Sequence, residues 1–235
     1  MLAGGRDIVD RWLSARAELK KTSDFDAFYN HARAELEARA QPFRKAAAEA
    51  KVLEAIDSYA GRKFEGTYEV RVSPYFDGEK MLNSVWPRAG GTRELDTIVG
   101  TEAGKKNSEY YFHERFPAAL WHQFSHGYFD ASVEAARADL AARGDGRKEP
   151  CYGAWEQCVK ENIVRAVTAR LLARRVSDKA ARRFLHDGDQ DLYPKMPALI
   201  EKLKEYEGDR ARWPTLDAFL PRLFEVFPKS EAGAK

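Results

Sequence analysis

The feature that most constrains this chain is a pair of histidines four residues apart, His122 and His126, in the stretch His-Gln-Phe-Ser-His. Side chains at this spacing lie on one face of an α-helix, so both imidazoles can reach a single metal ion. Pro117 stands near the expected start of the helix, where proline is tolerated, and Gly127 is expected to end or loosen it. Because short motifs also arise by chance, two histidines packed in a core are the alternative.

A third protein ligand is needed for a catalytic zinc site. The remaining histidines lie in segments that do not suit this role: His31, His113 and His186. Glu161 is the better candidate, because it lies on a mostly apolar stripe of a helix expected over residues 152–175. An acid in such a place needs a partner. The spacing leaves open whether that partner is a metal ion or Arg165, one turn further along the helix.

Together these motifs carry a family resemblance. His-Gln-Phe-Ser-His, followed 35 positions after His126 by Glu-Asn-Ile-Val-Arg-Ala, resembles a bacterial family of gluzincin-like metallopeptidases catalogued as a domain of unknown function. The usual motif of that family is HEFSH, then a helix reading E-x-x-V-R-A, and the resemblance covers about residues 65–227. It implies a zinc-dependent peptidase in which His122, His126 and Glu161 hold Zn²⁺, with Gln123 in the position of the general base.

Gln123 departs from the family motif, in which this residue is glutamate. A neutral amide cannot accept a proton from the attacking water, so we expect binding of zinc and of a peptide or protein substrate without turnover. The near-isosteric change favours an inactivated enzyme over a natural pseudo-peptidase. We expect Gln123 to point to the fourth coordination position. A protein that binds peptides without cutting them, and a helical interaction module without metal, are the other two hypotheses.

A zinc peptidase also needs a hydrogen-bond donor for the developing oxyanion. Tyr193 is the preferred candidate, because the family that the chain resembles carries an aromatic pattern there, and His186 and Tyr128 are alternatives. Arg165 stands where thermolysin-like enzymes carry an aspartate that supports a ligand histidine. The support for the histidines is therefore expected from another part of the chain.

The pattern of the chain predicts an α+β fold that is mainly helical. Residues 6–61 are expected to form an N-terminal helical segment packed on a zincin-like metallopeptidase domain at residues 62–228, with a helix break near Pro42. Strands are expected at residues 68–72, 82–86 and 95–100, as a small sheet ahead of the histidine helix. The strand at 95–99 is either a structural hairpin strand or a sheet edge that binds the substrate backbone through Leu95, Thr97 and Val99.

Composition excludes several classes of protein. The 235 residues carry a net charge of only +2, which gives no electrostatic case for nucleic acid, and no apolar run is long enough to span a membrane. Residues 1–5 lack the apolar core of a signal peptide, so the compartment stays open between cytoplasm and a secreted or periplasmic chain whose signal was removed. Cys151 and Cys158 are seven residues apart, which favours two structural thiols over a disulfide.

Overall fold

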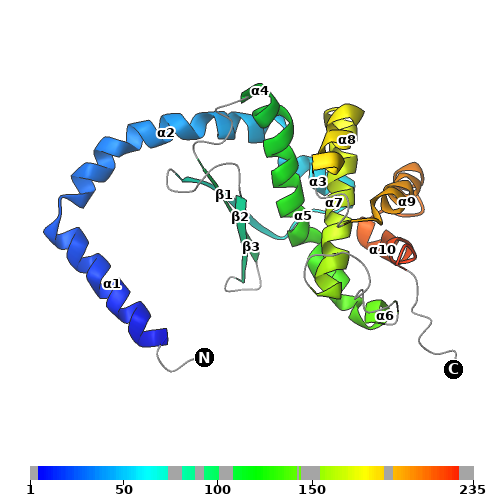
Figure 1. Cartoon of the computed structure of the whole chain (residues 1–235), viewed down its shortest axis with the longest axis horizontal. Coiled ribbons are helices and arrows are strands. Elements are labelled where there is room, and N and C mark those ends of the chain that lie inside the picture. Colours follow the sequence, from blue (N-terminus) through cyan, green and yellow to red (C-terminus); the bar gives the residue numbers. More distant parts are fainter. Residues whose placement is uncertain are drawn as a thin grey trace. The chain divides into compact units, whose positions relative to one another are not determined.

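The computed structural model describes residues 5–73, 81–87, 93–100, 108–141, 143, 154–187 and 193–227 (Figure 1). It is an α+β fold that is mainly helical, as predicted. The chain divides into two compact units, Met1–Gln41 and Pro42–Lys235. The division therefore falls after residue 41 rather than 61, and residues 42–61 belong to the larger unit.

The smaller unit contains helix α1 (Gly5–Thr22) and the start of α2 (Phe25–Glu49). Its side chains are exposed almost throughout, and they include the large apolar residues Ile8, Trp12 and Leu19.

Helix α2 continues through Pro42, so the break expected at that proline is wrong. Proline removes one backbone hydrogen bond from a helix interior and is ordinarily costly there. Tertiary packing offsets this cost, because Phe43 and Ala46, just beyond the proline, are buried in the core of the larger unit. The chain turns only at Lys51, whose left-handed backbone (φ 46°) separates α2 from α3 (Val52–Ala60).

The described strands form one mixed sheet in the order β1-β3-β2. Strand β3 (Arg93–Gly100) pairs in parallel with β1 (Gly66–Ser73) and antiparallel with β2 (Met81–Pro87). All three strands include the residues predicted for them, 68–72, 82–86 and 95–100.

The prediction of a free edge at residues 95–99 is wrong. Leu95, Thr97 and Val99 lie on β3, the central strand, and each has a paired residue on both neighbours. The hydrogen-bonding groups of a central strand are shared between its two ladders, so none is left to bind an added peptide strand. An edge for strand addition therefore has to come from β1 or β2.

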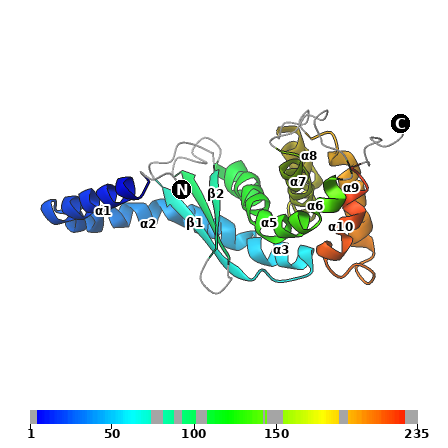
Figure 2. The same cartoon turned by 90° about the horizontal axis from the view of Figure 1, so that it is seen from below.

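The rest of the larger unit is helical. After two short turns, α4 (Ser108–Tyr110) and the π-helical η1 (Tyr111–Arg115), come α5 (Phe116–Ala135), α6 (Arg137–Ala141), α7 (Trp155–Arg175), α8 (Asp178–Asp187), α9 (Met196–Gly208) and α10 (Leu216–Phe224). Figures 1 and 2 both place α5 between the sheet and α7. Within the larger unit, the histidine helix thus contacts β2 and β3 as well as α3 and α7.

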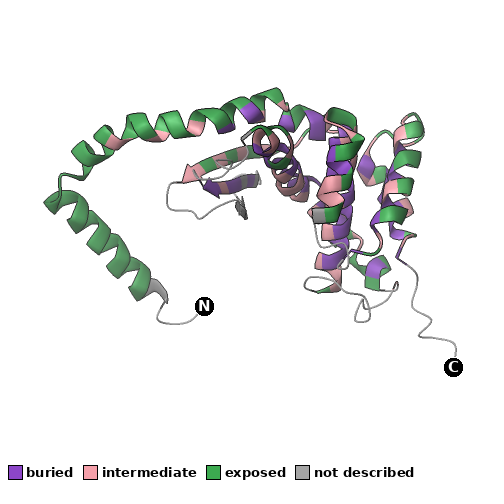
Figure 3. Ribbon diagram, turned by 45° about the horizontal axis from the view of Figure 1, so that its top comes forward, coloured by how far each residue is buried: buried purple, intermediate pink, exposed green. Residues whose placement is uncertain are grey.

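Apolar packing holds α5 in this central position. On the sheet side, the ring of Tyr68 on β1 packs against Phe124 with centroids 4.4 Å apart. On the other side, α7 presents an apolar face that includes the fully buried Ile163 and Val164 (Figure 3). Helix α5 also runs on through the buried Gly127 to Ala135, where an end at the glycine was expected. The residues beyond the glycine, such as Phe129, are buried, and their packing keeps this stretch helical.

Two further expectations, on the cysteines and on membrane-spanning helices, have different outcomes. Cys158 is buried and disulfide-bonded, so the expectation of two free thiols is wrong; Cys151 lies outside the described residues. Among the described residues, no helix has both the length and the apolar character needed to cross a membrane, as the sequence predicts.

Glu207 on α9 is the centre of a polar network that joins α9 to α7 and α3. Its carboxylate accepts two hydrogen bonds from Arg170 on α7, at 2.8 and 2.7 Å, and one from the Tyr59 hydroxyl on α3, at 2.9 Å. Arg174 adds a further contact at 3.1 Å, and the Glu207 side chain is only 10% exposed. Although burial opposes ionisation, the hydrogen bonds from Arg170 and Tyr59 lower the pKa of Glu207 below its ordinary value. The network therefore joins three helices through one ionised carboxylate.

We predict that Glu207→Gln lowers the free energy of unfolding at pH 7 by about 2 to 3 kcal/mol, because it removes the charge that the arginines face. Since the folded-state pKa is depressed, this stability is present above the ordinary pKa of 4.5 and is lost as the pH falls through the folded value. Urea unfolding between pH 2 and 7 should show a smaller loss of stability on acidification in the variant. Glu201→Gln, at an exposed carboxylate of the same helix, is the matched control and should change stability by less than about 0.5 kcal/mol.

Candidate metal centre

Helix α5 presents His122 and His126 on the face that meets α7. The imidazole centroids are 5.1 Å apart, and each side chain is 14% exposed. This placement follows from the four-residue spacing, which returns the second side chain to the same helix face. The other three histidines of the chain, His31, His113 and His186, are exposed.

Glu161 reaches the two histidines from α7. Its carboxylate oxygens lie 3.5 Å from His122 Nε2 and 3.4 Å from His126 Nε2, and the side chain is 16% exposed. One residue earlier, the nearly buried Lys160 contacts Glu134 on α5 at 2.6 Å. This ion pair joins α7 to α5 close to the site.

The three groups suit a zinc ion by type and by spacing. Their ligand atoms all lie within 4.8 Å of one another. Ligands at ~2.05 Å from a tetrahedral zinc are about 3.3 Å apart, close to the separations between Nε2 and carboxylate oxygen. The same separations are longer than good hydrogen bonds, which are roughly 2.7 to 3.2 Å. Two imidazoles and one carboxylate also form the donor set of known catalytic zinc sites.

The electrostatics of the three groups differ sharply. Burial and the neighbouring His126 lower the pKa of His122 to about 3. Burial also disfavours the charged form of His126, but its contacts with the carboxylates of Asp130 and Glu161 raise its pKa to about 9. Burial opposes the ionisation of Glu161, yet the contact with His126 and the nearby positive charges lower its pKa to about 2. His122 is thus neutral near pH 7, whereas the positively charged form of His126, beside the ionised Glu161, is favoured.

Asp130 is a neighbour of the candidate metal ligands that the sequence pattern did not reveal. Its Oδ1 lies 3.0 Å from His126 Nδ1, one helical turn after the histidine. With Nδ1 held by this carboxylate, Nε2 is the ring nitrogen that faces Glu161. His122 Nδ1 is buried without such a partner among the described residues. The sequence does contain a signal for this contact, because Asp130 follows His126 by four residues. The expectation that the helix ends or loosens at Gly127 left Asp130 out of consideration.

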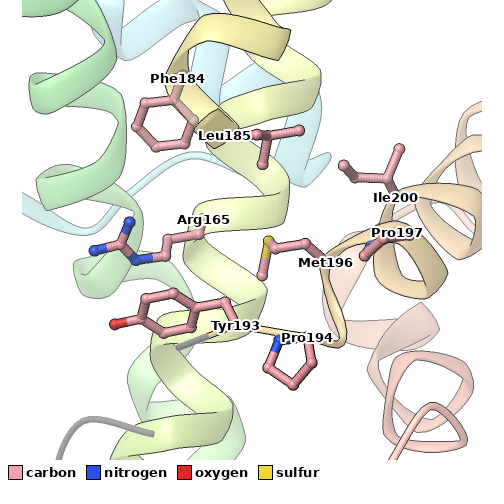
Figure 4. Close-up of a pocket in the computed structure, with 8 residues that line it drawn as sticks. All are labelled: Arg165, Phe184, Leu185, Tyr193, Pro194, Met196, Pro197 and Ile200. Atoms are coloured by element: carbon pink, nitrogen blue, oxygen red, sulfur yellow. The ribbon is translucent and has the colours of Figure 1, made fainter. Parts of the chain in front are cut away.

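Arg165 also contacts Glu161. Its Nε is 3.8 Å from Glu161 Oε2, the oxygen that lies 3.5 Å from His122 Nε2, so the contact with Arg165 that the sequence left open is present. The guanidinium stacks 4.2 Å over the ring of Tyr193, the candidate oxyanion donor, which is buried just before α9 (Figure 4). In Figure 4 the guanidinium and the phenol oxygen point to the same side. The alternative donor Tyr128 instead donates its hydroxyl to Asp57 on α3.

The other site residues expected from sequence do not join the group formed by His122, His126 and Glu161. Gln123 lies on α5 beside His122 and is partly buried, and its orientation toward a fourth coordination position stays a prediction. Leu95, Thr97 and Val99 are taken up by the centre of the sheet. A second group with metal-ligand atoms in reach of one another occurs on the sheet, Glu69, Glu94 and Asp96. Arg71 contacts both Glu69 and Asp96 there, at 3.0 and 3.4 Å, and supplies the positive charge.

Comparison with known proteins adds the family. No curated protein and no solved structure matches the chain. A family model described as "Domain of unknown function (DUF4932)" matches residues 5–226, which include the whole candidate metal centre. The chain therefore belongs to this family, DUF4932.

Proposed function

We propose that this protein has the site of a zinc-dependent metallopeptidase, with its general base replaced by an amide. The observation that carries the proposal is the convergence of His122, His126 and Glu161 from two packed helices. The depressed pKa of His122 and the carboxylate of Asp130 behind His126 support it, because both favour imidazole nitrogens that are free to bind a metal.

Each residue of the site would have a separate role. His122, His126 and Glu161 would hold Zn²⁺, which when bound lowers the pKa of water to about 7 and polarises a peptide carbonyl. Asp130 fixes the tautomer and the direction of His126. Arg165 contacts the Glu161 carboxylate at 3.8 Å and places a positive charge beside it. Tyr193 is placed beside Arg165 and would donate a hydrogen bond to the developing oxyanion.

Gln123 is the reason to expect binding without turnover. In the H-E-x-x-H arrangement the glutamate takes a proton from the attacking water and passes it to the leaving amine. The glutamine side chain has nearly the same size and still forms hydrogen bonds, but it does not accept that proton. The zinc ligands do not depend on this residue, so the site keeps its donor set while losing its base.

Gln123 also favours a second function, a protein that binds peptides and does not cut them. In that case the same three ligands would hold zinc, and the zinc would bind a carbonyl or carboxylate of the peptide. The two functions share the metal and the substrate class and differ only in the activity recovered when glutamate is restored.

We predict that the protein binds about one zinc per chain and that His122→Ala loses this zinc, because two ligands are too few for a stable site. Metal analysis after dialysis against sub-stoichiometric chelator measures the content. His113→Ala, at an exposed histidine just before α5, is the matched control and should bind zinc like the unchanged protein. Equal zinc content in both variants would contradict the assignment of the site.

Asp130→Ala should lower zinc affinity by about 10- to 100-fold without unfolding the protein, because His126 loses the carboxylate that orients it. Competition with a fluorescent zinc chelator measures the affinity, and circular dichroism checks the helices. Asp139→Ala removes an exposed aspartate whose partner is Arg143, one turn on, and should leave the affinity unchanged. An affinity unaffected by Asp130→Ala would mean that Asp130 does not support the ligand.

We predict that Gln123→Glu gains peptidase activity, by about 10²- to 10⁴-fold over the unchanged chain, because it restores a general base. A library of peptides analysed by mass spectrometry detects the cleavage, and metal analysis should give the same zinc content in both forms. The double variant Gln123→Glu with His122→Ala is the control and should be inactive. Zinc binding with no cleavage by Gln123→Glu would favour the second function, peptide binding.

A further inference from the structure

A cavity lies beside the candidate metal centre, between α7, α8 and α9 (Figure 4). Its volume is about 370 Å³, within the range of sites that bind small molecules or side chains. Six of the lining residues are apolar: Phe184, Leu185, Pro194, Met196, Pro197 and Ile200. The other two are Arg165 and Tyr193.

Arg165 and Tyr193 connect this cavity to the metal ligands. Arg165 is one turn after Glu161 on α7, and its Nε is 3.8 Å from the Glu161 carboxylate. The same guanidinium stacks on Tyr193 at 4.2 Å, and Figure 4 shows this pair at the opposite end of the cavity from Pro197 and Ile200. The wall formed by Arg165 and Tyr193 therefore separates the apolar space from the metal ligands by little more than one side chain.

The chemistry of the lining selects what enters. Transfer of an apolar side chain from water into such a space is favourable. Transfer of a charged side chain is unfavourable, because it loses its hydration. Arg165 is the one charged residue among the eight that line the cavity, and its guanidinium is stacked on Tyr193 and contacts Glu161, so the lining favours an apolar group. The volume is large enough for a phenylalanine, leucine or methionine side chain.

We propose that the cavity binds a large apolar side chain of the peptide, next to the bond that lies at the metal. The inference rests on the proposed function and specifies its substrate class: peptides with a residue such as phenylalanine beside the scissile bond. Arg165 and Tyr193, at the end of the cavity nearest Glu161, would contact the peptide backbone there.

The first test detects the side chain directly and needs neither zinc nor cleavage. Met196 lines the cavity, while the other two methionines of the chain are Met1 and Met81, the latter on β2. In zinc-free protein carrying ¹³C-labelled methionine methyl groups, N-acetyl-phenylalaninamide should shift the Met196 signal, identified from its loss in Met196→Leu. N-acetyl-alaninamide should leave it in place at the same concentration. A Met196 signal that responds equally to both amides, or to neither, overturns the proposal.

The second test measures selectivity in the Gln123→Glu background. Peptides with phenylalanine beside the cleaved bond should be cut at least about 100-fold more efficiently, in kcat/KM, than the same peptides with alanine. Ile200→Phe, which fills the cavity from α9, should reduce this preference by about 10-fold or more with zinc content unchanged. Ala198→Phe adds the same ring at an exposed position of the same helix and should keep the preference.

The two tests separate this proposal from the proposed function. Cleavage without preference for large apolar residues, with no response of Met196, leaves a peptidase and refutes the cavity as its subsite. A selective Met196 shift in a protein that binds no zinc refutes the peptidase, and the cavity then stands as an apolar binding site. If Ile200→Phe is unfolded by circular dichroism, the methyl titration of the unchanged chain decides.

Discussion

The packing of α5 against α7 is the interaction on which the rest of the structure depends. These helices bring together residues that are 35 positions apart, His126 and Glu161, at a distance of 3.4 Å. Burial of apolar residues on both helices, such as Phe129 and Ile163, drives the contact, and an ion pair between Lys160 and Glu134 also joins the two helices. A shift of one helix along the other would separate the carboxylate from the imidazoles.

The same packing explains why the polar groups of the site can be buried. A carboxylate in an apolar helix stripe is costly unless a positive charge or a metal ion faces it. In the structure the Glu161 carboxylate contacts both histidines and Arg165. The histidines differ in their environment, because His126 has the carboxylate of Asp130 at its Nδ1 and the buried His122 Nδ1 has no such partner among the described residues. A divalent cation would satisfy the whole set at once and would then link the stability of this region to metal binding.

Under the proposed function, Gln123 separates metal binding from proton transfer. The positions of His122, His126 and Glu161 depend on helix packing, whereas proton transfer would depend on the one side chain at position 123. A change at that side chain would leave the packing intact. The apolar cavity next to Arg165 is likewise formed by α7, α8 and α9 without Gln123.

By itself, the sequence determined the features that depend on local periodicity. The four-residue step places His122 and His126 on one helix face, and alternation of apolar residues marks the three strands, because both depend only on near neighbours. Tertiary structure decided the rest. The central position of β3 depends on long-range pairing, and α2 and α5 pass through Pro42 and Gly127 because burial of the residues beyond them outweighs local preference. The continuation of α5 beyond Gly127 brings Asp130 to His126. The contact between these two side chains therefore depends on packing and not on the histidine motif.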